Sequence, residues 1–262
     1  MPAQGGTQFT FRRSLVPHRT DRDVSTPGAA DPTTGRRALI VLGGDTPPLG
    51  VTDVVPGHDL VIAADSGVDL ALALGLSVDL AVGDFDSVTV DGLARIEGQG
   101  ARIERHPAAK DATDFELALE AAQQMGASAA TVIGGGGGRL DHLLANALVM
   151  ASSRFEALDL VALDGPARLH VVRRRRCLHG EPGELVTLLA ANGPATGITT
   201  SGLRYPLTDD RLEPGSSRGV SNQLIGSEAE VVVGSGVLLV VLPGPDHLVA
   251  PPVDHRPEGT ET

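Results

Sequence analysis

The stretch DLAVGDFDS, residues 79–87, joins an apolar run to two aspartates that stand one residue apart. It is one of six short apolar runs that alternate with helical patterns in the first half of the chain. Such runs, without polar alternation, are typical of strands buried on both faces in βαβ units. The sequence therefore predicts an α/β fold that begins as a mostly parallel sheet flanked by helices. The predicted strands are 38–44, 59–67, 79–87, 101–107, 129–138 and 159–165, and the predicted helices lie near 68–75, 113–126 and 140–153.

The pattern changes after residue 166. Short apolar segments follow, separated by Gly, Pro and Asp turns and without a convincing helix among them. We therefore expect a small antiparallel all-β domain, sandwich-like in form, after the α/β part. The predicted organisation is a disordered arm at 1–36, an α/β domain at 37–166, a β-domain at 167–250 and a disordered tail at 251–262.

Composition narrows the class of function. The 262 residues carry a formal net charge of −12, which argues against nucleic acid as a partner. No apolar run reaches the roughly 18 residues of a membrane span, and the first residues lack the apolar centre of a secretory signal, so we expect a soluble cytoplasmic protein with no membrane partner. The single cysteine, Cys177, rules out an internal disulfide and a multi-cysteine metal site. The run Arg173–Arg176 is interpreted as the solvated end of a strand.

The two aspartates of the opening stretch indicate a cation site. In an extended segment, Asp84 and Asp86 point to one side while Phe85 points the opposite way into apolar packing. The pair lies at the carboxyl end of a predicted parallel strand, where open α/β sheets bind ligands. Two close carboxylates repel each other unless a cation lies between them, and hard oxygen ligands suit Mg²⁺ that also binds phosphates. The alternative is a turn in which one aspartate caps the backbone.

A second polar cluster, KDATDFE, begins at Lys110, directly after a predicted strand, and opens a helix. Asp111 and Asp114 lie three residues apart and look toward one crevice, and Thr113 caps the helix. Lys110 is the only lysine of the chain and is a point charge suited to phosphate. Acidic residues in a first helical turn also act as partners of the helix dipole, and this alternative suffices for Asp111.

A third cluster, IGGGGGRLDHLLAN at residues 133–146, places five glycines between a predicted strand and a predicted helix. Backbone N–H groups and a helix N-terminus can hold phosphate at such a place. The run is neither a Walker loop nor a dinucleotide-binding fingerprint, and a flexible turn is the alternative. Arg139 can pair with phosphate, and Asp141 can position or deprotonate a hydroxyl or join the metal shell. Together the three clusters predict a Mg²⁺-nucleotide site at the strand ends.

The order GDFDS, KDATDFE and GGGGGRLDH resembles the thiamine pyrophosphokinase family, and the later SGLRYPLTDDRLEPGSSRGVSNQ resembles that family's C-terminal β-domain. The resemblance runs from about residue 38 to residue 245. It implies transfer of the β,γ-diphosphoryl group of ATP to the hydroxyethyl oxygen of thiamine, giving thiamine diphosphate and AMP, with Mg²⁺ required. It also implies a homodimer whose site lies between the nucleotide domain of one subunit and the β-domain of the other.

The resemblance assigns roles to individual positions. Asp84, Asp86 and Asp114 match the carboxylates that bind metal and phosphate, and Arg139 with Asp141 matches the element near the reacting phosphates. Ser221 and Asn222 match the pair on the thiamine side. The positions expected to contact ATP are Lys110, Asp111, Thr113 and the cradle glycines Gly135, Gly136, Gly137 and Gly138.

Two features depart from the family pattern. The chain has no tryptophan, whereas some family members stack an aromatic ring on the pyrimidine of thiamine; Tyr205 and five phenylalanines remain. The strand end AADSG carries Ser66 in place of a glycine, and its Asp65 suits the positive thiazolium of thiamine, with a strand-end turn as the alternative. Two other functions stay open: diphosphoryl transfer to another hydroxyalkyl heterocycle such as a pterin, and a non-catalytic nucleotide-binding relative.

Overall fold

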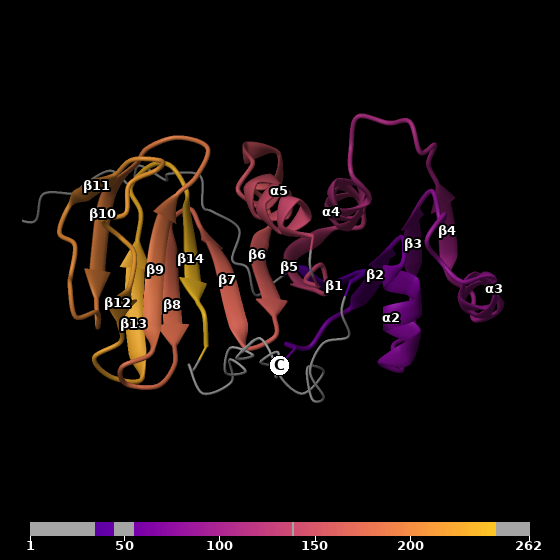
Figure 1. Ribbon diagram of the computed structural model, residues 1–262, viewed down its shortest axis with the longest axis horizontal. Coiled ribbons are helices and arrows are strands. Elements are labelled where there is room, and N and C mark those ends of the chain that lie inside the picture. Colours follow the sequence, from indigo (N-terminus) through magenta and orange to yellow (C-terminus); the bar gives the residue numbers. More distant parts are fainter. Residues whose placement is uncertain (1–34, 45–54, 138, 245–262) are drawn as a thin grey trace, which may run out of the picture. The chain divides into compact units, whose positions relative to one another are not determined.

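The computed structural model describes residues 35–44, 55–137 and 139–244 (Figure 1). Residues 1–34 of the predicted arm and the whole predicted tail lie outside this range, and Arg36 already belongs to the first strand. No helix within these ranges is long and apolar enough to cross a membrane.

The first half of the chain forms the predicted parallel sheet. Its strands pair in parallel in the order β6-β5-β1-β2-β3-β4. The strands are β1 (Arg36–Leu42), β2 (Leu60–Ala64), β3 (Leu80–Gly83), β4 (Arg102–Arg105), β5 (Ala127–Ile133) and β6 (Asp159–Asp164). The helices are α2 (Gly67–Ala73), α3 (Val90–Gly98), α4 (Asp114–Gln124) and α5 (Leu140–Met150), with a 3-10 turn η1 at Ser153–Phe155.

Both faces of the parallel sheet are buried, as the unbroken apolar runs predict. Alternate residues of β1 point to opposite faces, so Ile40 joins the core formed with α4, whereas Val41 joins the core formed with α2 and α3. Figure 1 shows α4 and α2 on opposite sides of these strands. The predicted cap at the start of α4 is confirmed, because the hydroxyl of Thr113 accepts a hydrogen bond from the Glu116 N–H at 3.2 Å.

Helix α3 is a feature that the sequence analysis missed. Its segment contains two glycines, which lower helix propensity, and only Gly92 and Ile96 are buried. The helix is fixed instead by polar contacts at its start. Thr89 caps the Gly92 N–H at 3.0 Å, and Asp69 of α2 accepts hydrogen bonds from both the hydroxyl and the N–H of Thr89.

The second half of the chain is antiparallel, as predicted. Strands β7, β14, β9 and β12 continue the first sheet beyond β6 to give a row of ten, and β11, β10, β13 and β8 form a second sheet. Side chains of both sheets meet in one apolar core, so the sandwich-like expectation is confirmed. The bounds are β7 (Ala167–Val172), β8 (Arg175–His179), β9 (Leu185–Ala190), β10 (Ala195–Ser201), β11 (Asp210–Leu212), β12 (Asn222–Gln223), β13 (Glu228–Val232) and β14 (Leu238–Leu242).

The two halves share one sheet. Strands β6 and β7 form a hairpin in which Asp164 pairs with Ala167, and the boundary predicted at residue 166 falls inside this turn. The division into separate domains stays a prediction, since backbone pairing runs across it.

The arginine run between β7 and β8 is only partly the solvated strand end that was expected. Arg174 and Arg175 are exposed. Arg173 is half-buried and donates to the carbonyl oxygens of Met150 and Ser152 at 3.1 and 2.8 Å, where α5 ends. Arg176 is also half-buried and pairs with Asp159 of β6. The prediction is wrong for these two arginines because each meets backbone or carboxylate acceptors as the chain crosses to the second sheet.

Candidate active site

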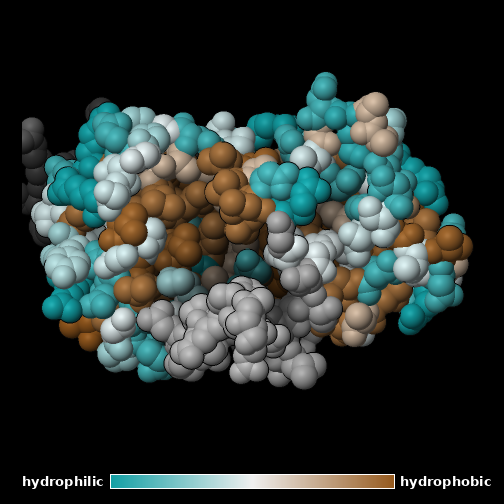
Figure 2. Space-filling model, viewed as in Figure 1, coloured by the Kyte–Doolittle hydropathy of each residue, from teal (hydrophilic) through white to brown (hydrophobic). Residues whose placement is uncertain are grey.

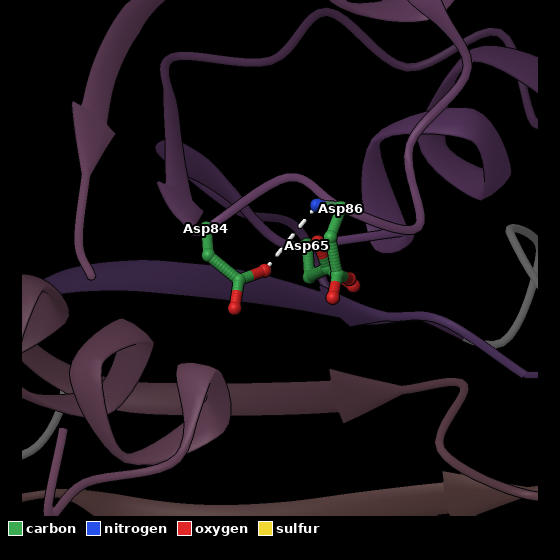
Figure 3. Close-up of side chains that lie close together, drawn as sticks. All are labelled: Asp65, Asp84 and Asp86. Atoms are coloured by element: carbon green, nitrogen blue, oxygen red, sulfur yellow. Dashed lines mark hydrogen bonds between the residues drawn. The ribbon is translucent and has the colours of Figure 1, made fainter. Parts of the chain in front are cut away.

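Three carboxylates gather where two neighbouring parallel strands end. Asp65 directly follows β2, and Asp84 and Asp86 follow β3 (Figure 3). One oxygen from each side chain lies within 4.8 Å of the others. The structure thus brings Asp84 and Asp86 together, as their spacing predicted, and adds Asp65, which the sequence analysis had placed on the thiamine side.

The backbone that presents the pair is a turn. Strand β3 ends at Gly83, and Phe85 has a left-handed backbone with φ of 62°. The Asp86 N–H donates to Asp84 Oδ1 at 3.3 Å, and Phe85 is buried in the core. The extended geometry expected for residues 84–86 is therefore wrong, because a left-handed central residue reverses the chain locally. The cation site and the aspartate turn, which were alternatives for this stretch, therefore occur together, because the turn itself places both carboxylates in the cluster.

Asp65 also has a left-handed backbone, with φ of 46°, which is uncommon for a residue other than glycine. Its N–H donates to the carbonyl oxygen of Val82 in β3 at 2.9 Å. This bond ties the end of β2 to the neighbouring strand. The strained turn thereby fixes the Asp65 carboxylate beside Asp84 and Asp86.

Asp114 lies next to this cluster but has a partner of its own. Its Oδ1 lies 3.0 Å from the Lys110 ammonium, and a Cβ added to Gly83 would stand 3.3 Å from both this oxygen and the Asp65 Cα. Of the three carboxylates expected to bind metal, two lie in the close group and Asp114 stands at its edge. Thr113 is the cap of α4, and Asp111 precedes it on the exposed surface.

The electrostatics of the cluster favour a cation. Burial raises the pKa of Asp65, partly opposed by a hydrogen bond from the Ser66 backbone, and the negative charges of Asp114, Asp84 and Asp86 raise it further. Asp65 Oδ1 is also buried without a hydrogen-bond partner among the described residues. A hard divalent cation would relieve both the repulsion and the missing contact, so this donor set fits Mg²⁺.

The glycine loop after β5 packs against the end of β1. The Gly135 N–H donates to the Gly43 carbonyl at 2.7 Å, and a Cβ on Gly44 would collide with the carbonyl oxygen of Gly136. The close approach of these two backbone segments therefore requires glycine at this position, whether or not the loop binds phosphate. Beside the loop is a hollow of about 240 Å³, lined by Gly135, Gly136, Gly137, Arg139, Leu140, Leu143 and Asp164. Gly138 lies outside the described residues.

Arg139, which lines this hollow, pairs with Asp141 in the first turn of α5. Arg139 Nε and Nη2 donate to the two carboxylate oxygens of Asp141 at 2.9 and 2.8 Å. This bidentate contact holds the pKa of Asp141 well below its usual range. Asp141 is thus ionised and able to accept a hydrogen bond, but it is a weak base.

The residues expected on the thiamine side lie in the antiparallel half. Asn222 is buried, and its amide binds the backbone of Tyr205: Oδ1 accepts from the Tyr205 N–H at 3.0 Å and Nδ2 donates to the Tyr205 carbonyl at 2.8 Å. Ser221 has φ of 58° and is exposed. Asn222 therefore positions Tyr205, whose side chain is 60% exposed, with the Arg204 guanidinium 5.7 Å from its ring centre. The sequence left the stacking partner open between Tyr205 and five phenylalanines, and it gave no sign that Asn222 supports Tyr205.

These two groups of residues are far apart within one chain. In the ten-stranded sheet, β12 and β3 are eight strand positions apart. At about 4.8 Å per step this is on the order of 40 Å. One chain therefore does not bring Asn222 and Asp84 to a common small ligand.

Comparison with known families matches both halves of the chain. Residues 51–162 match the model described as thiamin pyrophosphokinase, catalytic domain. Residues 169–238 match the model described as thiamin pyrophosphokinase, vitamin B1 binding domain. The two matches follow each other in the order that the sequence motifs predicted.

Individual relatives agree with these matches. A thiamine pyrophosphokinase of Bacillus subtilis strain 168 is 27% identical over 201 residues, which span 73% of this chain and 90% of the relative. The crystal structure of thiamine pyrophosphokinase from Bacillus subtilis is similar with a TM-score of 0.70 and 26% identity, covering 80% of this chain and all of that one. A thiamin pyrophosphokinase family protein from Enterococcus faecalis gives a TM-score of 0.67 and 28% identity, covering 80% and 99%.

Proposed function

The chain belongs to the thiamine pyrophosphokinase family, and from this premise we propose that it transfers the diphosphoryl group of ATP to the hydroxyl of thiamine, giving thiamine diphosphate and AMP. The observation that carries the assignment of the site is the group formed by Asp65, Asp84 and Asp86 at the ends of β2 and β3. It stands where open α/β sheets bind phosphorylated ligands.

Magnesium is part of this proposal. Asp65, Asp84 and Asp86 would hold the ion, with Asp114 beside them, because their oxygens are close, mutually repelling and incompletely hydrogen-bonded. Bound there, Mg²⁺ supplies positive charge that offsets the charge of the phosphates.

The other residues of the site position the phosphates. Lys110 lies beside Asp114, and its ammonium is a point charge for a phosphate oxygen. Gly136, Gly137 and Arg139 line the hollow at the start of α5, and their backbone N–H groups and guanidinium suit the same anionic group, whereas the Gly135 N–H is bonded to Gly43. Diphosphoryl transfer depends mainly on alignment and charge neutralisation, which these groups provide.

In this scheme Asp141 accepts a hydrogen bond and does not act as a general base. Its low pKa means that it does not hold a proton near neutral pH. As an ionised acceptor it orients the attacking hydroxyl of thiamine, while its pairing with Arg139 keeps it next to a side chain that lines the hollow.

We also propose that the protein works as a homodimer with shared sites. The Tyr205 platform, held by Asn222, lies about 40 Å from Asp84 along the sheet of one chain. A second copy is needed if the platform receives the thiamine ring while the aspartates face the phosphates. Ser221 and Arg204 would then approach the substrate together with Tyr205.

A cytoplasmic location is the remaining part of the proposal. The one cysteine, Cys177, is free and exposed, which suits a reducing compartment. Cell fractionation followed by immunodetection tests this directly.

The activity is tested by incubating the protein with Mg²⁺ and ATP, adding thiamine or a hydroxymethyl pterin in separate reactions, and measuring AMP. We expect AMP and thiamine diphosphate with thiamine only. AMP formation with the pterin alone would contradict the choice of acceptor, and no AMP with either alcohol would point to a non-catalytic relative.

A further inference from the structure

A second hollow lies near the amino ends of the parallel strands, on the edge of the sheet opposite the aspartate cluster. Its volume is about 230 Å³. Asp159 and Asp164 are the first and last residues of β6, and the first lines this hollow whereas the second lines the hollow beside the glycine loop. At roughly 3.3 Å per residue, about 17 Å of strand separates the two aspartates. We call the second hollow the strand-start pocket.

The floor of the strand-start pocket is an apolar part of the sheet that is incompletely covered. Ala129 and Thr131 of β5 and Val161 of β6 line it, and the strand register places Thr131 beside Val161. All three residues are half-buried, although the central strands of a parallel sheet are usually buried on both faces. Farther along β5, Ile133 is fully buried in the core formed with α2. The cover therefore ends before the strand starts and leaves an apolar surface there.

This floor is separate from the apolar surface at the candidate active site. Figure 2 shows apolar residues gathered at the position of α5 and over the neighbouring antiparallel strands. Leu140 and Leu143 of α5 line the hollow beside the glycine loop, so their exposure belongs to the site already described. Among the residues that the structure describes, those lining the strand-start pocket include none from α5 and none from the aspartate cluster. The pocket therefore needs an explanation of its own.

Arg176 of β8 lines the strand-start pocket and is incompletely hydrogen-bonded. Its Nη2 pairs with Asp159, whereas its Nε is buried and has no hydrogen-bond partner in the described chain. A guanidinium has more N–H donors than this single pairing uses. Burial also lowers the pKa of Arg176, because the charged form is poorly solvated. The positive charge of Arg176 is thus only partly compensated, and a second anion beside it would be stabilised.

A second arginine makes the lining of the pocket positive. Arg37, at the start of β1, lines the pocket and is exposed, and its guanidinium has no ion-pair partner in the part of the chain that the structure describes. Arg37 and Arg176 stand against Asp159 alone, so the lining keeps one net positive charge when His58 is neutral. The whole chain has a net charge of −12. A positive pocket in such a chain favours an anionic ligand.

Charge and size together define the class of ligand. One net positive charge matches a carboxylate better than a phosphate monoester, which carries close to two negative charges at neutral pH. Arginine also pairs with carboxylates through parallel N–H groups. The volume of about 230 Å³ lies below the roughly 300–1,000 Å³ of typical ligand pockets, so the ligand is small. The apolar floor suits a short aromatic or branched body.

We propose that the strand-start pocket binds a small monocarboxylate, with its carboxylate paired to Arg37 and Arg176 and its apolar body on Ala129, Thr131 and Val161. The proposal does not rest on the proposed diphosphoryl transfer, because the pocket and the hollow beside the glycine loop lie at opposite ends of β6. Its test measures binding to the full-length protein without Mg²⁺, ATP or thiamine.

The probe is 4-fluorobenzoate, whose binding is followed by fluorine NMR as protein is added. We expect saturable binding, and a Kd about tenfold higher for 4-fluorobenzamide, which has nearly the same shape but no charge. Arg37→Gln should raise the Kd of the acid about tenfold. The matched control is Arg36→Gln, since Arg36 is the exposed neighbour of Arg37, does not line the pocket, and donates to the Met125 carbonyl oxygen at 3.4 Å. This control should keep the wild-type Kd.

A variant that changes shape without changing charge completes the test. Ala129→Leu fills the floor of the pocket and should abolish binding, with circular dichroism melting to check that each variant is folded. If Ala129→Leu does not fold, the two arginine variants and the comparison of acid with amide decide the outcome.

Four results would each overturn the proposal. These are no binding of 4-fluorobenzoate at about 10 mM, equal binding of the acid and the amide, an unchanged Kd in Arg37→Gln, and continued binding by folded Ala129→Leu. Inorganic phosphate distinguishes the two kinds of anion. It should displace the probe only at higher concentration than unlabelled benzoate does, and displacement at lower concentration would overturn the choice of a carboxylate.

Discussion

At the scale of single residues, the cluster at the ends of β2 and β3 stores electrostatic repulsion. Asp65 is held in a left-handed turn with one carboxylate oxygen that has no hydrogen-bond partner in the described chain, and three further carboxylates raise its pKa. Such strain and repulsion are retained where a site needs them, because the fold around them is strong enough to impose the geometry. A residue that only formed a turn would not need a raised pKa together with an unpartnered carboxylate oxygen. These two properties therefore mark Asp65 as a candidate cation ligand.

Asp65→Asn keeps the shape of the side chain and tolerates the left-handed backbone, but it removes one charge. Without metal the variant should melt at or above the wild-type temperature, because repulsion is relieved. Wild-type protein should gain about 5 °C or more at a Mg²⁺ concentration a hundredfold above its Kd, and the variant should lose most of this gain. Differential scanning calorimetry in EDTA and in Mg²⁺ measures both. Asp91→Asn, an exposed acid in the first turn of α3, is the control; an unchanged Mg²⁺ response in Asp65→Asn would contradict the metal assignment.

Asn222 supports the backbone of Tyr205, and its expected contact with thiamine stays a prediction. Asn222→Ala removes both hydrogen bonds to the Tyr205 backbone and leaves a small void in a buried position. We expect unfolding free energy to fall by about 2 kcal/mol. Chemical denaturation with urea measures the change, and Gln99→Ala at an exposed helix end should stay within about 0.5 kcal/mol of wild type. A neutral Asn222→Ala would show that the Tyr205 backbone does not depend on this amide.

At the scale of elements, strand β7 carries a partly buried histidine, His170. Burial, assisted by the positive charge of Arg168, lowers the pKa of His170 to about 4. Its Nδ1 has no hydrogen-bond partner among the described residues. The folded protein therefore favours the neutral ring, and β7 links the parallel strands to the antiparallel ones.

This histidine predicts a pH dependence of stability. Because the pKa is lower in the folded chain than in the unfolded chain, the unfolded chain binds more protons between about pH 6.5 and pH 4. Stability is thus full above this window and is lost as pH falls through it, by up to about 3 kcal/mol from this group. Urea denaturation at several pH values should show a smaller loss in His170→Gln than in wild type over that window. Equal slopes for both proteins would show that other groups carry the dependence.

Elements with strong local signals were predictable from the sequence, and those fixed by distant contacts were not. The apolar runs gave the parallel strands because burial on both faces leaves no polar alternation. Helix α3 was missed because polar contacts from Asp69 hold its start. The same distinction between local and distant contacts applies to the residues of the candidate site. The spacing of Asp84 and Asp86 indicated their proximity, whereas the place of Asp65 beside them depends on the pairing of β2 with β3.

At the scale of the whole molecule, the long sheet is the reason for proposing that two chains share the site. Strand β14 returns from the end of the described chain to pair with β7 and β9, so that the antiparallel half extends the parallel half in one row. No local pattern reveals this continuation, because it joins segments about 70 residues apart in the sequence. The row separates the Tyr205 platform from the aspartates, and the two-fold symmetry of the proposed homodimer would bring them together.

A heterodimer of two impaired chains tests this arrangement. One chain carries Asp84→Asn and the other carries Tyr205→Ala, an exposed position whose loss should leave the fold intact. Each homodimer should have little activity, since every site lacks one of the two groups. In a heterodimer isolated through two different affinity tags, both changes fall on one site and the other site is complete, so activity should return to about half of wild type. Thiamine diphosphate formation measures this, with mass spectrometry confirming one chain of each kind. Activity no higher than that of the two homodimers would place both residues in the same chain's site and contradict the shared arrangement.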